Sequence, residues 1–198
     1  MTTDSNAPST KRPLIFLAVL ALATVAGLYF MNRGGSGPQT LPDGLKKVSE
    51  FTLKKADGSD FGTEQMKDHV VVVHFWASWC APCIPEIPEV LSAAKKLSKD
   101  QEGRTIYWLF VSQDETWAKA QSVLKPEMLS ENVISVLDPE AKISDIFGSY
   151  QFPETYLVNR DGGITAKWIG PQKWREAWGD QAIAGVESLS RLKKLPDL

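Results

Sequence analysis

The sequence predicts an α/β domain in which a central β-sheet carries helices on both faces. The run 70–76 is apolar and rich in β-branched residues, as in a buried strand. Apolar residues then recur at three- and four-residue spacing from Ile84 to Leu97, which indicates a helix. Strand and helix patterns alternate toward the C-terminus, and this alternation places helices on both faces of a sheet.

Both cysteines of the chain, Cys80 and Cys83, lie where this strand gives way to this helix. A helix N-terminus presents unpaired N–H groups and a partial positive charge, which stabilise a thiolate. The thiolate is the reactive form of cysteine. Because two residues separate them, the two thiols can close a small, reversible disulfide, and the pair predicts a redox site.

A C-x-x-C pair has less specific interpretations. Zinc would need two more ligands, and the two histidines of the chain, His69 and His74, should point to opposite faces of the strand-like run. We therefore expect no metal site and no cofactor. A purely structural disulfide would close a tiny loop and remove little chain entropy.

Composition sets further limits. The 198 residues suffice for one domain with appendages, and a hydrophobic content of 43% suffices for a packed core. The formal net charge is −2, so nothing favours nucleic acid as a partner.

The N-terminal region predicts a membrane anchor. Residues 1–13 form a polar, cytoplasmic tail, and its Lys11 and Arg12 precede the uncharged apolar run 14–31. The run is near the lower length limit of a spanning helix, and the positive flank keeps the N-terminus in the cytoplasm. Cleavage as a signal peptide after Ala23 is the alternative, but it would leave an apolar new N-terminus. With the anchor uncleaved, we expect the rest of the protein to lie on the outer side of the membrane.

Residues 32–44 are rich in glycine and predict a flexible linker, followed by one domain over 45–198. The alternating run 48–53, a turn at 56–59 and Phe61 predict an N-terminal β-hairpin. Beyond the cysteines we expect a helix over 84–99, a strand over 105–111, a helix over 116–124, a strand over 133–137, a short helix from Ile143 to Phe147 ended by Gly148, a hairpin of 152–158 with 164–169, and a helix over 172–195.

The run from Phe75 to Cys83 (F-W-A-S-W-C-A-P-C) resembles the strand and W-C-x-x-C signature of the thioredoxin superfamily. It is most similar to the membrane-anchored, extracytoplasmic reductases of the ResA/TlpA and cytochrome c maturation type. The Pro-Glu-Thr-aromatic segment that starts at Pro153 resembles the cis-proline segment of the same family. The resemblance covers about residues 45–195. It implies a thioredoxin-like fold with a central mixed sheet, an N-terminal β-hairpin extension, and a single-pass location in the bacterial inner membrane with the domain on the periplasmic side.

Four residues are candidates for the chemistry. We expect Cys80 to be the attacking thiol, since it is nearer the helix N-terminus and better exposed in this fold, and Cys83 to resolve the mixed disulfide. Glu86 lies three residues after Cys83 on one helix face. It matches the glutamate of ResA-like reductases, and we expect it to be the acid–base group. His74 occupies the place of a buried acid or amide in thioredoxin relatives, and we expect it to tune the site.

Four more residues are candidates for substrate binding. Trp79 should line the site, and Pro82 lies between the cysteines. Pro153, if cis, would face the disulfide and leave the backbone of Phe152 free to pair with an extended substrate. Thioredoxins carry a smaller residue before that proline, so Phe152 changes the shape of the groove.

The predicted function is reduction of disulfides in exported proteins, with electrons from a membrane thiol donor. Apocytochrome c C-x-x-C-H sites are one candidate substrate. The alternative is a non-catalytic binding or metal-delivery module on the same fold. A peroxidase is a weaker alternative, because it would need a differently placed cysteine and the chain has no third cysteine.

Overall fold

The structure is a computed structural model of the chain. It describes residues 22, 24, 39–40, 46–100, 102–172 and 174. The chain divides into two compact units, residues 1–35 and 36–198. In the first unit, Leu22 and Thr24 are helical. No helix within the described residues is both long and apolar enough to cross a membrane. The predicted cytoplasmic tail, most of the predicted anchor and linker, and most of the predicted C-terminal helix lie outside the described residues.

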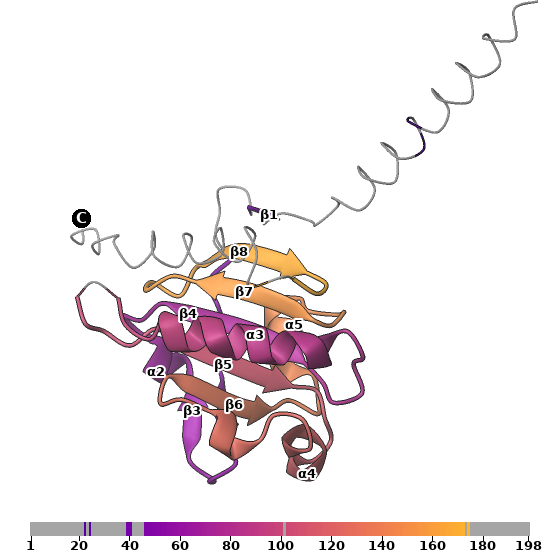
Figure 1. The fold of residues 1–198 in the computed structure, drawn as a ribbon. Coiled ribbons are helices and arrows are strands. Elements are labelled where there is room, and N and C mark those ends of the chain that lie inside the picture. Colours follow the sequence, from indigo (N-terminus) through magenta and orange to yellow (C-terminus); the bar gives the residue numbers. More distant parts are fainter. Residues whose placement is uncertain are drawn as a thin grey trace, which may run out of the picture. The chain divides into compact units, whose positions relative to one another are not determined.

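The second unit contains the elements of an α/β domain (Figure 1). In chain order they are β1 Gln39–Thr40, β2 Thr52–Lys54, β3 Asp60–Gly62, α2 Thr63–Met66, β4 Val71–Trp76, α3 Cys83–Lys96, β5 Tyr107–Ser112, α4 Trp117–Gln121, the 3-10 helix η1 Pro126–Met128, β6 Val133–Leu137, α5 Lys142–Phe147, β7 Glu154–Val158 and β8 Ile164–Ile169. β1 lies within the segment for which the sequence predicts a flexible linker.

The sheet is mixed, as the resemblance implies. Six strands of the described chain pair in the order β1-β8-β7-β4-β5-β6. β4 runs parallel to β5 and antiparallel to β7, and β5 runs parallel to β6. β7 and β8 form the predicted hairpin. β4 is therefore central, and its end at Trp76 delivers the chain to the two cysteines.

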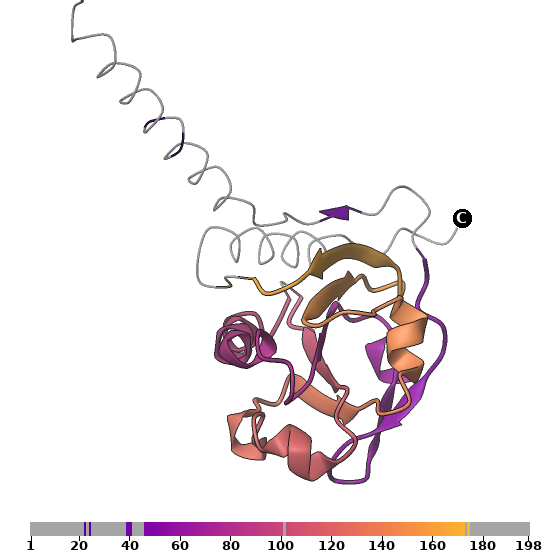
Figure 2. The ribbon, with the colours of Figure 1, turned by 90° about the vertical axis from the view of Figure 1, so that its right-hand side faces the viewer.

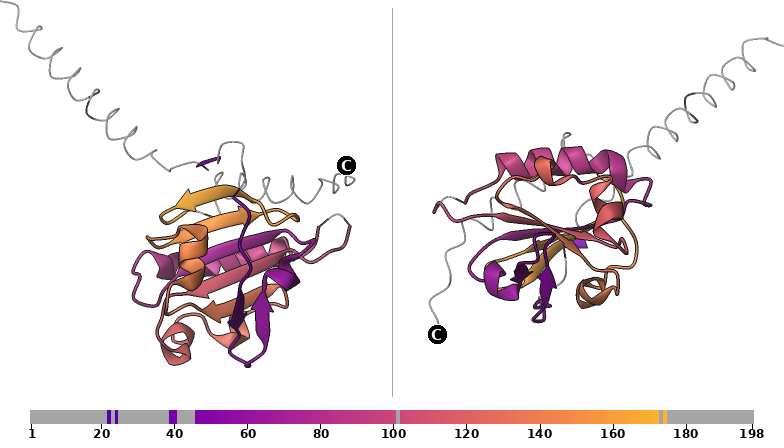
Figure 3. Two further views of the ribbon diagram at one scale, coloured as in Figure 1. Left: turned by 180° about the vertical axis from the view of Figure 1, so that it is seen from behind. Right: turned by 90° about the horizontal axis from the view of Figure 1, so that it is seen from below.

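Each face of the sheet carries its own apolar core, because side chains alternate along β4. Val72 and Trp76 face α3 and pack with Cys83 and Ile87. Val73 and Phe75 face the opposite side, where they pack with residues of α5 and of the N-terminal hairpin. Figures 2 and 3 show α3 on one face of the sheet, with α5 and the β2–β3 hairpin on the other. Helices on both faces are thus confirmed.

The predicted N-terminal hairpin is present as β2 and β3. The backbones of Gly62 and Phe51 approach so closely that a Cβ on Gly62 would lie 2.1 Å from the carbonyl oxygen of Phe51. Just after β2, Lys55 forms an antiparallel bridge to Val136 of β6, the last strand in the sheet order. The hairpin therefore touches one edge of the sheet.

Two predicted helices are longer than the observed ones. α3 leaves helical geometry at Leu97 (φ −109°, ψ 63°), because the next residues turn to pair with 104–106: Ile106 donates to the carbonyl of Ser98, and Lys99 bridges to Thr105. α4 ends at Gln121. Pro126 then holds Lys125 in an extended conformation (ψ 146°), which stops helical propagation.

Candidate active site

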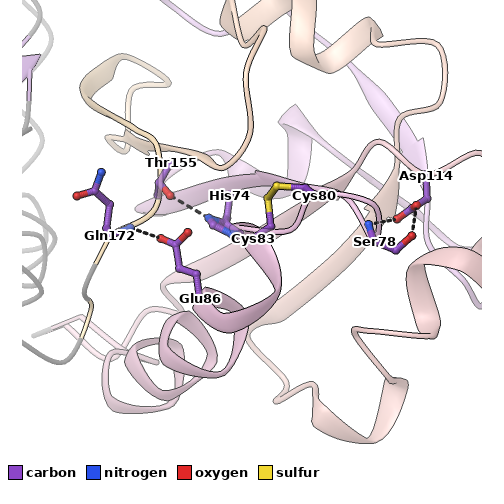
Figure 4. The surroundings of a disulfide bond; sticks show 8 residues. All are labelled: His74, Ser78, Cys80, Cys83, Glu86, Asp114, Thr155 and Gln172. Atoms are coloured by element: carbon purple, nitrogen blue, oxygen red, sulfur yellow. Dashed lines mark hydrogen bonds between the residues drawn. A yellow bond between two sulfur atoms is a disulfide. The ribbon is translucent and has the colours of Figure 1, made fainter. Parts of the chain in front are cut away.

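The two cysteines form a disulfide at the N-terminus of α3 (Figure 4). Their Cα atoms lie 5.3 Å apart, and the S–S distance is 2.00 Å. Pro82 is the N-cap residue of α3 and Cys83 its first residue. Successive turns build this junction, because the N–H of Cys80 donates to the Ala77 carbonyl and the N–H of Cys83 donates to the Cys80 carbonyl. The predicted strand–C-x-x-C–helix arrangement is confirmed.

Access to the two sulfurs differs in the predicted direction. Cys80 retains 5% of its surface, whereas Cys83 has none. Cys80 also precedes the helix, where the unpaired N–H groups of the first turn point. A thiolate there gains from the helix dipole, whereas a buried thiol at Cys83 resists ionisation.

Glu86 is buried on the first turn of α3. Its Oε1 accepts a hydrogen bond from the indole N–H of Trp174 at 2.5 Å and one from the backbone N–H of Gln172 at 3.2 Å. Its Oε2 is buried and has no hydrogen-bond partner among the described residues. Burial raises the pKa of Glu86 to about 7, although the two hydrogen bonds oppose this shift. Near neutral pH the group can therefore release or take up a proton.

His74 lies on β4, on the same face as Val72 and Trp76, which is the face that α3 covers. Its Nδ1 is hydrogen-bonded to the Oγ1 of Thr155 on β7 at 2.9 Å, and its ring stands edge-on to Phe110. Desolvation by complete burial lowers the pKa of His74 to about 3. His74 is therefore neutral at working pH, so any influence on the thiols comes from a neutral ring.

The loop between β4 and the cysteines is fixed by an acid that the sequence did not single out. Asp114 is buried beyond the end of β5 and accepts hydrogen bonds from the backbone N–H and the hydroxyl of Ser78, at 2.9 and 2.6 Å. It also accepts from the hydroxyl of Ser112 at 2.7 Å. An aspartate two residues after a buried strand, together with a serine two residues before a cysteine, is the signal that could have found it.

A second loop borders the site. The Phe152–Pro153 peptide bond is cis, as the resemblance implies. The ring of Phe152 stands edge-on to Trp79, with centroids 6.0 Å apart. Trp79 is 64% exposed, so it lines a surface, whereas Trp76 is fully buried in the core. The structure thus places Phe152, which precedes the cis Pro153, against Trp79, the residue before Cys80.

Behind the second loop lies a polar cluster for which the sequence predicts no role. Glu154 is buried and forms an ion pair with Lys167 at 3.1 Å. It also accepts a hydrogen bond from the hydroxyl of Tyr156 at 3.0 Å. The carbonyl of Gly148 accepts hydrogen bonds from both Tyr156 and Lys167, at 3.2 and 3.1 Å. The cluster anchors the start of the 148–153 loop.

Taken together, the geometry suits reversible thiol chemistry. Cys80 lies just before a helix N-terminus and retains 5% of its surface, and Cys83 is completely buried and bonded to it. A carboxyl group with a pKa near neutrality lies one helical turn beyond Cys83. A thiolate can attack a disulfide from outside, and the second thiol can then displace the substrate. Within the described residues, no cluster of three or more histidines, cysteines and carboxylates could hold a metal ion.

Comparison with known proteins agrees with this chemistry. Residues 44–183 match the Redoxin family. The chain is 30% identical to "Thiol:disulfide interchange protein DsbE" of Allochromatium vinosum, over 85% of this chain and 91% of that protein. It is also 30% identical to "Thiol:disulfide interchange protein HelX" of Rhodobacter capsulatus, over 81% and 88%.

Solved structures share the fold. A putative thiol:disulfide interchange protein DsbE from Chlorobium tepidum superposes with a TM-score of 0.61 at 22% identity, over 73% of this chain and 97% of that one. StoA from Bacillus subtilis superposes with a TM-score of 0.55 at 22% identity, over 70% and 97%. The chain therefore belongs to the Redoxin family and is a thiol–disulfide oxidoreductase of the thioredoxin superfamily.

Proposed function

We propose that this oxidoreductase is anchored in the bacterial inner membrane by residues 14–31 and reduces disulfides of exported proteins on the periplasmic side. The relatives named as thiol:disulfide interchange proteins support exchange with protein disulfides. The charged flank and apolar run of the N-terminus support the anchor. Apocytochrome c, with its C-x-x-C-H site, is the first substrate to test.

Reduction proceeds in two displacements. The Cys80 thiolate attacks one sulfur of the substrate disulfide, forms a mixed disulfide and releases a substrate thiolate. Cys83 then loses its proton and attacks Cys80, which frees the second substrate thiolate and closes the Cys80–Cys83 disulfide. Two electrons pass to the substrate. A membrane thiol donor returns the enzyme to its dithiol state by the reverse exchange.

Glu86 is the acid–base group of this cycle. Cys83 is fully buried, so its thiol needs a nearby base before it can attack. Glu86 lies three residues further along α3, and a carboxyl group with a pKa of about 7 is matched to proton transfer near neutral pH. His74, neutral and buried on the α3-facing side of β4, tunes the site through its polarity.

The substrate binds between the cis-proline loop on one side and Trp79 and Pro82 on the other. Neither the N–H nor the carbonyl of Phe152 makes a backbone hydrogen bond among the described residues. Backbone N–H and C=O groups need hydrogen-bond partners when they are buried. An extended substrate segment that binds here supplies these partners to Phe152 by strand addition.

The observation that carries this proposal is the asymmetry in exposure between Cys80 and Cys83. It is tested with full-length protein carrying Cys83→Ser or Cys80→Ser, each presented with an oxidised C-x-x-C-H peptide. Cys83→Ser should accumulate a mixed disulfide through Cys80, identified by mass spectrometry. Equally efficient trapping through Cys83 in the Cys80→Ser protein would overturn the assignment of Cys80 as the attacking thiol. Trapping by neither variant would favour a non-catalytic binding module.

A further inference from the structure

A polar cleft of about 420 Å³ lies at the end of the sheet opposite the cysteines. Its lining comes from the end of α3 and from the segments that lead into β5 and β6. The cysteines instead follow the end of β4, which runs parallel to β5. Every residue that lines the cleft has a polar side chain, and six of them carry an ammonium or a hydroxyl group: Lys95, Lys99, Ser98, Thr105, Tyr107 and Ser130.

Hydrogen bonds hold the three segments that form the cleft. The side-chain amide of the buried Asn132 donates to the carbonyls of Ala94 and Ile106, at 2.9 and 3.2 Å. Its oxygen accepts from the hydroxyl of Ser130 at 2.8 Å. The N–H of Ile106 donates to the carbonyl of Ser98 at 3.0 Å. The cleft is therefore formed before a ligand binds, and binding costs little conformational freedom.

The lysines of the cleft have no acidic partner within the described residues, since neither Lys95 nor Lys99 forms an ion pair there. The ammonium group of Lys99 donates instead to the neutral hydroxyl of Thr105 at 2.9 Å. Glu131 also lines the cleft, so two lysines and one glutamate give it a formal charge of +1. The cleft thus favours an anion.

Lysines near the C-terminus of a helix often serve its last carbonyl groups. Here other groups already bond two of these carbonyls. Asn132 donates to Ala94, and the indole N–H of Trp108 donates to the carbonyl of Leu97 at 3.1 Å. An ammonium group has three donors, so Lys99 keeps two after its bond to Thr105. The lysines can therefore donate to a ligand.

We infer that this cleft binds a phosphate group with a hydroxylated substituent, as in a glycerol phosphate. Ammonium groups donate charge-assisted hydrogen bonds to phosphate oxygens, and the hydroxyl side chains can donate to or accept from hydroxyls of the ligand. The volume falls within the range of small-molecule sites. Such a group occurs in free solutes and in the headgroup of phosphatidylglycerol. The site lies away from the disulfide, so the inference goes beyond the proposed function and does not depend on it.

The test is a saturation-transfer NMR titration of sn-glycerol 3-phosphate onto the oxidised, full-length protein in a non-ionic detergent. We expect saturable binding that weakens as salt rises, and no binding of glycerol, which lacks the phosphate. Lys95→Gln and Lys99→Gln should each weaken binding by up to about fivefold, the loss of one exposed ion pair. Glu131→Gln should strengthen binding, because it removes a like charge.

The matched control is Lys47→Gln, which removes an exposed lysine beside β8 and should leave the affinity unchanged. Absence of saturable binding, or equal affinities of wild type and the Lys95→Gln/Lys99→Gln double variant, would overturn the inference. The double variant should still reduce the C-x-x-C-H peptide at the wild-type rate, which shows that its fold is intact. Failure of the wild type to reduce that peptide would contradict the proposed function alone.

Vesicles separate the two sources of the phosphate group. The full-length protein is reconstituted into phosphatidylcholine vesicles with or without phosphatidylglycerol, and the titration with sn-glycerol 3-phosphate is repeated. Weaker binding in the presence of phosphatidylglycerol would show that lipid headgroups occupy the cleft. Equal binding in both kinds of vesicle would assign the cleft to a free solute.

Discussion

Trp174 donates its indole N–H to Glu86 and so ties the segment after β8 to the helix that carries the redox-active cysteines. The bond reaches one carboxylate oxygen, while the other is buried without a partner among the described residues. The bond lowers the pKa of Glu86 and burial raises it, and burial prevails. The carboxyl group therefore changes its charge close to neutral pH, one helical turn from Cys83.

Glu86→Gln should change how stability depends on pH. The folded-state pKa of about 7 lies above the ordinary value of 4.5, so the folded state binds more protons than the unfolded state between these values. Wild-type stability should therefore fall as pH rises through this window, by about 3 kcal/mol in the contribution of this group. Gln keeps an acceptor for Trp174 but has no charge, so the variant should lack this fall. Urea denaturation of the oxidised protein at several pH values measures the difference.

The same substitution should flatten the pH profile of mixed-disulfide resolution near pH 7. Resolution should also slow by about 10²-fold or more, as general-base losses do. Glu127→Gln, at an exposed position on η1, is the matched control and should alter neither quantity. An unchanged rate and profile in Glu86→Gln would mean that the Cys83 proton goes directly to water.

His74→Asn should leave the profile near neutrality in place, because the wild-type ring is already uncharged there. Its effect should appear in acid. The lowered pKa of His74 means that the unfolded state binds a proton that the folded state refuses, between the ordinary value of 6.5 and about 3. Wild-type stability should therefore decline as pH falls below 6.5, and Asn should remove that part of the decline. If His74→Asn instead shifts the neutral profile while Glu86→Gln does not, the two roles are reversed.

Asp114→Ala should destabilise the oxidised protein by about 2–3 kcal/mol, since it leaves the buried hydroxyl of Ser112 and the half-buried N–H and hydroxyl of Ser78 without their acceptor. It should also raise proteolytic cleavage within the loop that leads to Cys80. The neighbouring Glu115 is exposed, and within the described part of the chain its one ion pair is with Lys119. Glu115→Ala should therefore change stability by less than about 0.5 kcal/mol. Equal effects of the two substitutions would contradict a supporting role for Asp114.

Lys167→Met should cost about 3 kcal/mol, because it strands the buried carboxylate of Glu154 without its cation. The double variant Lys167→Met/Glu154→Gln should recover part of this loss, since the charge that needed a partner is gone. Thermal unfolding of the single and double variants measures the coupling. Additive losses would show that Lys167 and Glu154 do not stabilise each other.

Local patterns predicted most of the domain. The β-branched run gave β4, the residues after Ile143 gave α5 with its stop at Gly148 (φ 69°), and the Asn-Arg-Asp-Gly-Gly turn gave the β7–β8 hairpin. These signals lie within a few residues of the element they specify. The ends of α3 and α4 were predicted less well. The residues after α3 pair with residues 104–106, and Pro126 follows α4.

Spacing in the sequence related the site residues that lie close together along the chain, but it did not predict the contacts between residues far apart in the sequence. Cys80 lies just before α3, and Cys83 and Glu86 lie on its first turn, so spacing alone relates them. The partners of Glu86 lie 86 and 88 residues away, and those of Asp114 depend on where β4 and β5 end side by side. The charge state of His74 also depends on complete burial. No spacing in the sequence reveals such contacts.

The bridge from Lys55 to Val136 affects how easily other polypeptide chains can pair with the edge of the sheet. An open sheet edge can recruit extended polypeptide chains as extra strands. Contact between the N-terminal hairpin and β6 shortens the stretch of edge that such a chain could join. The hairpin thus protects part of this sheet edge from pairing with other chains.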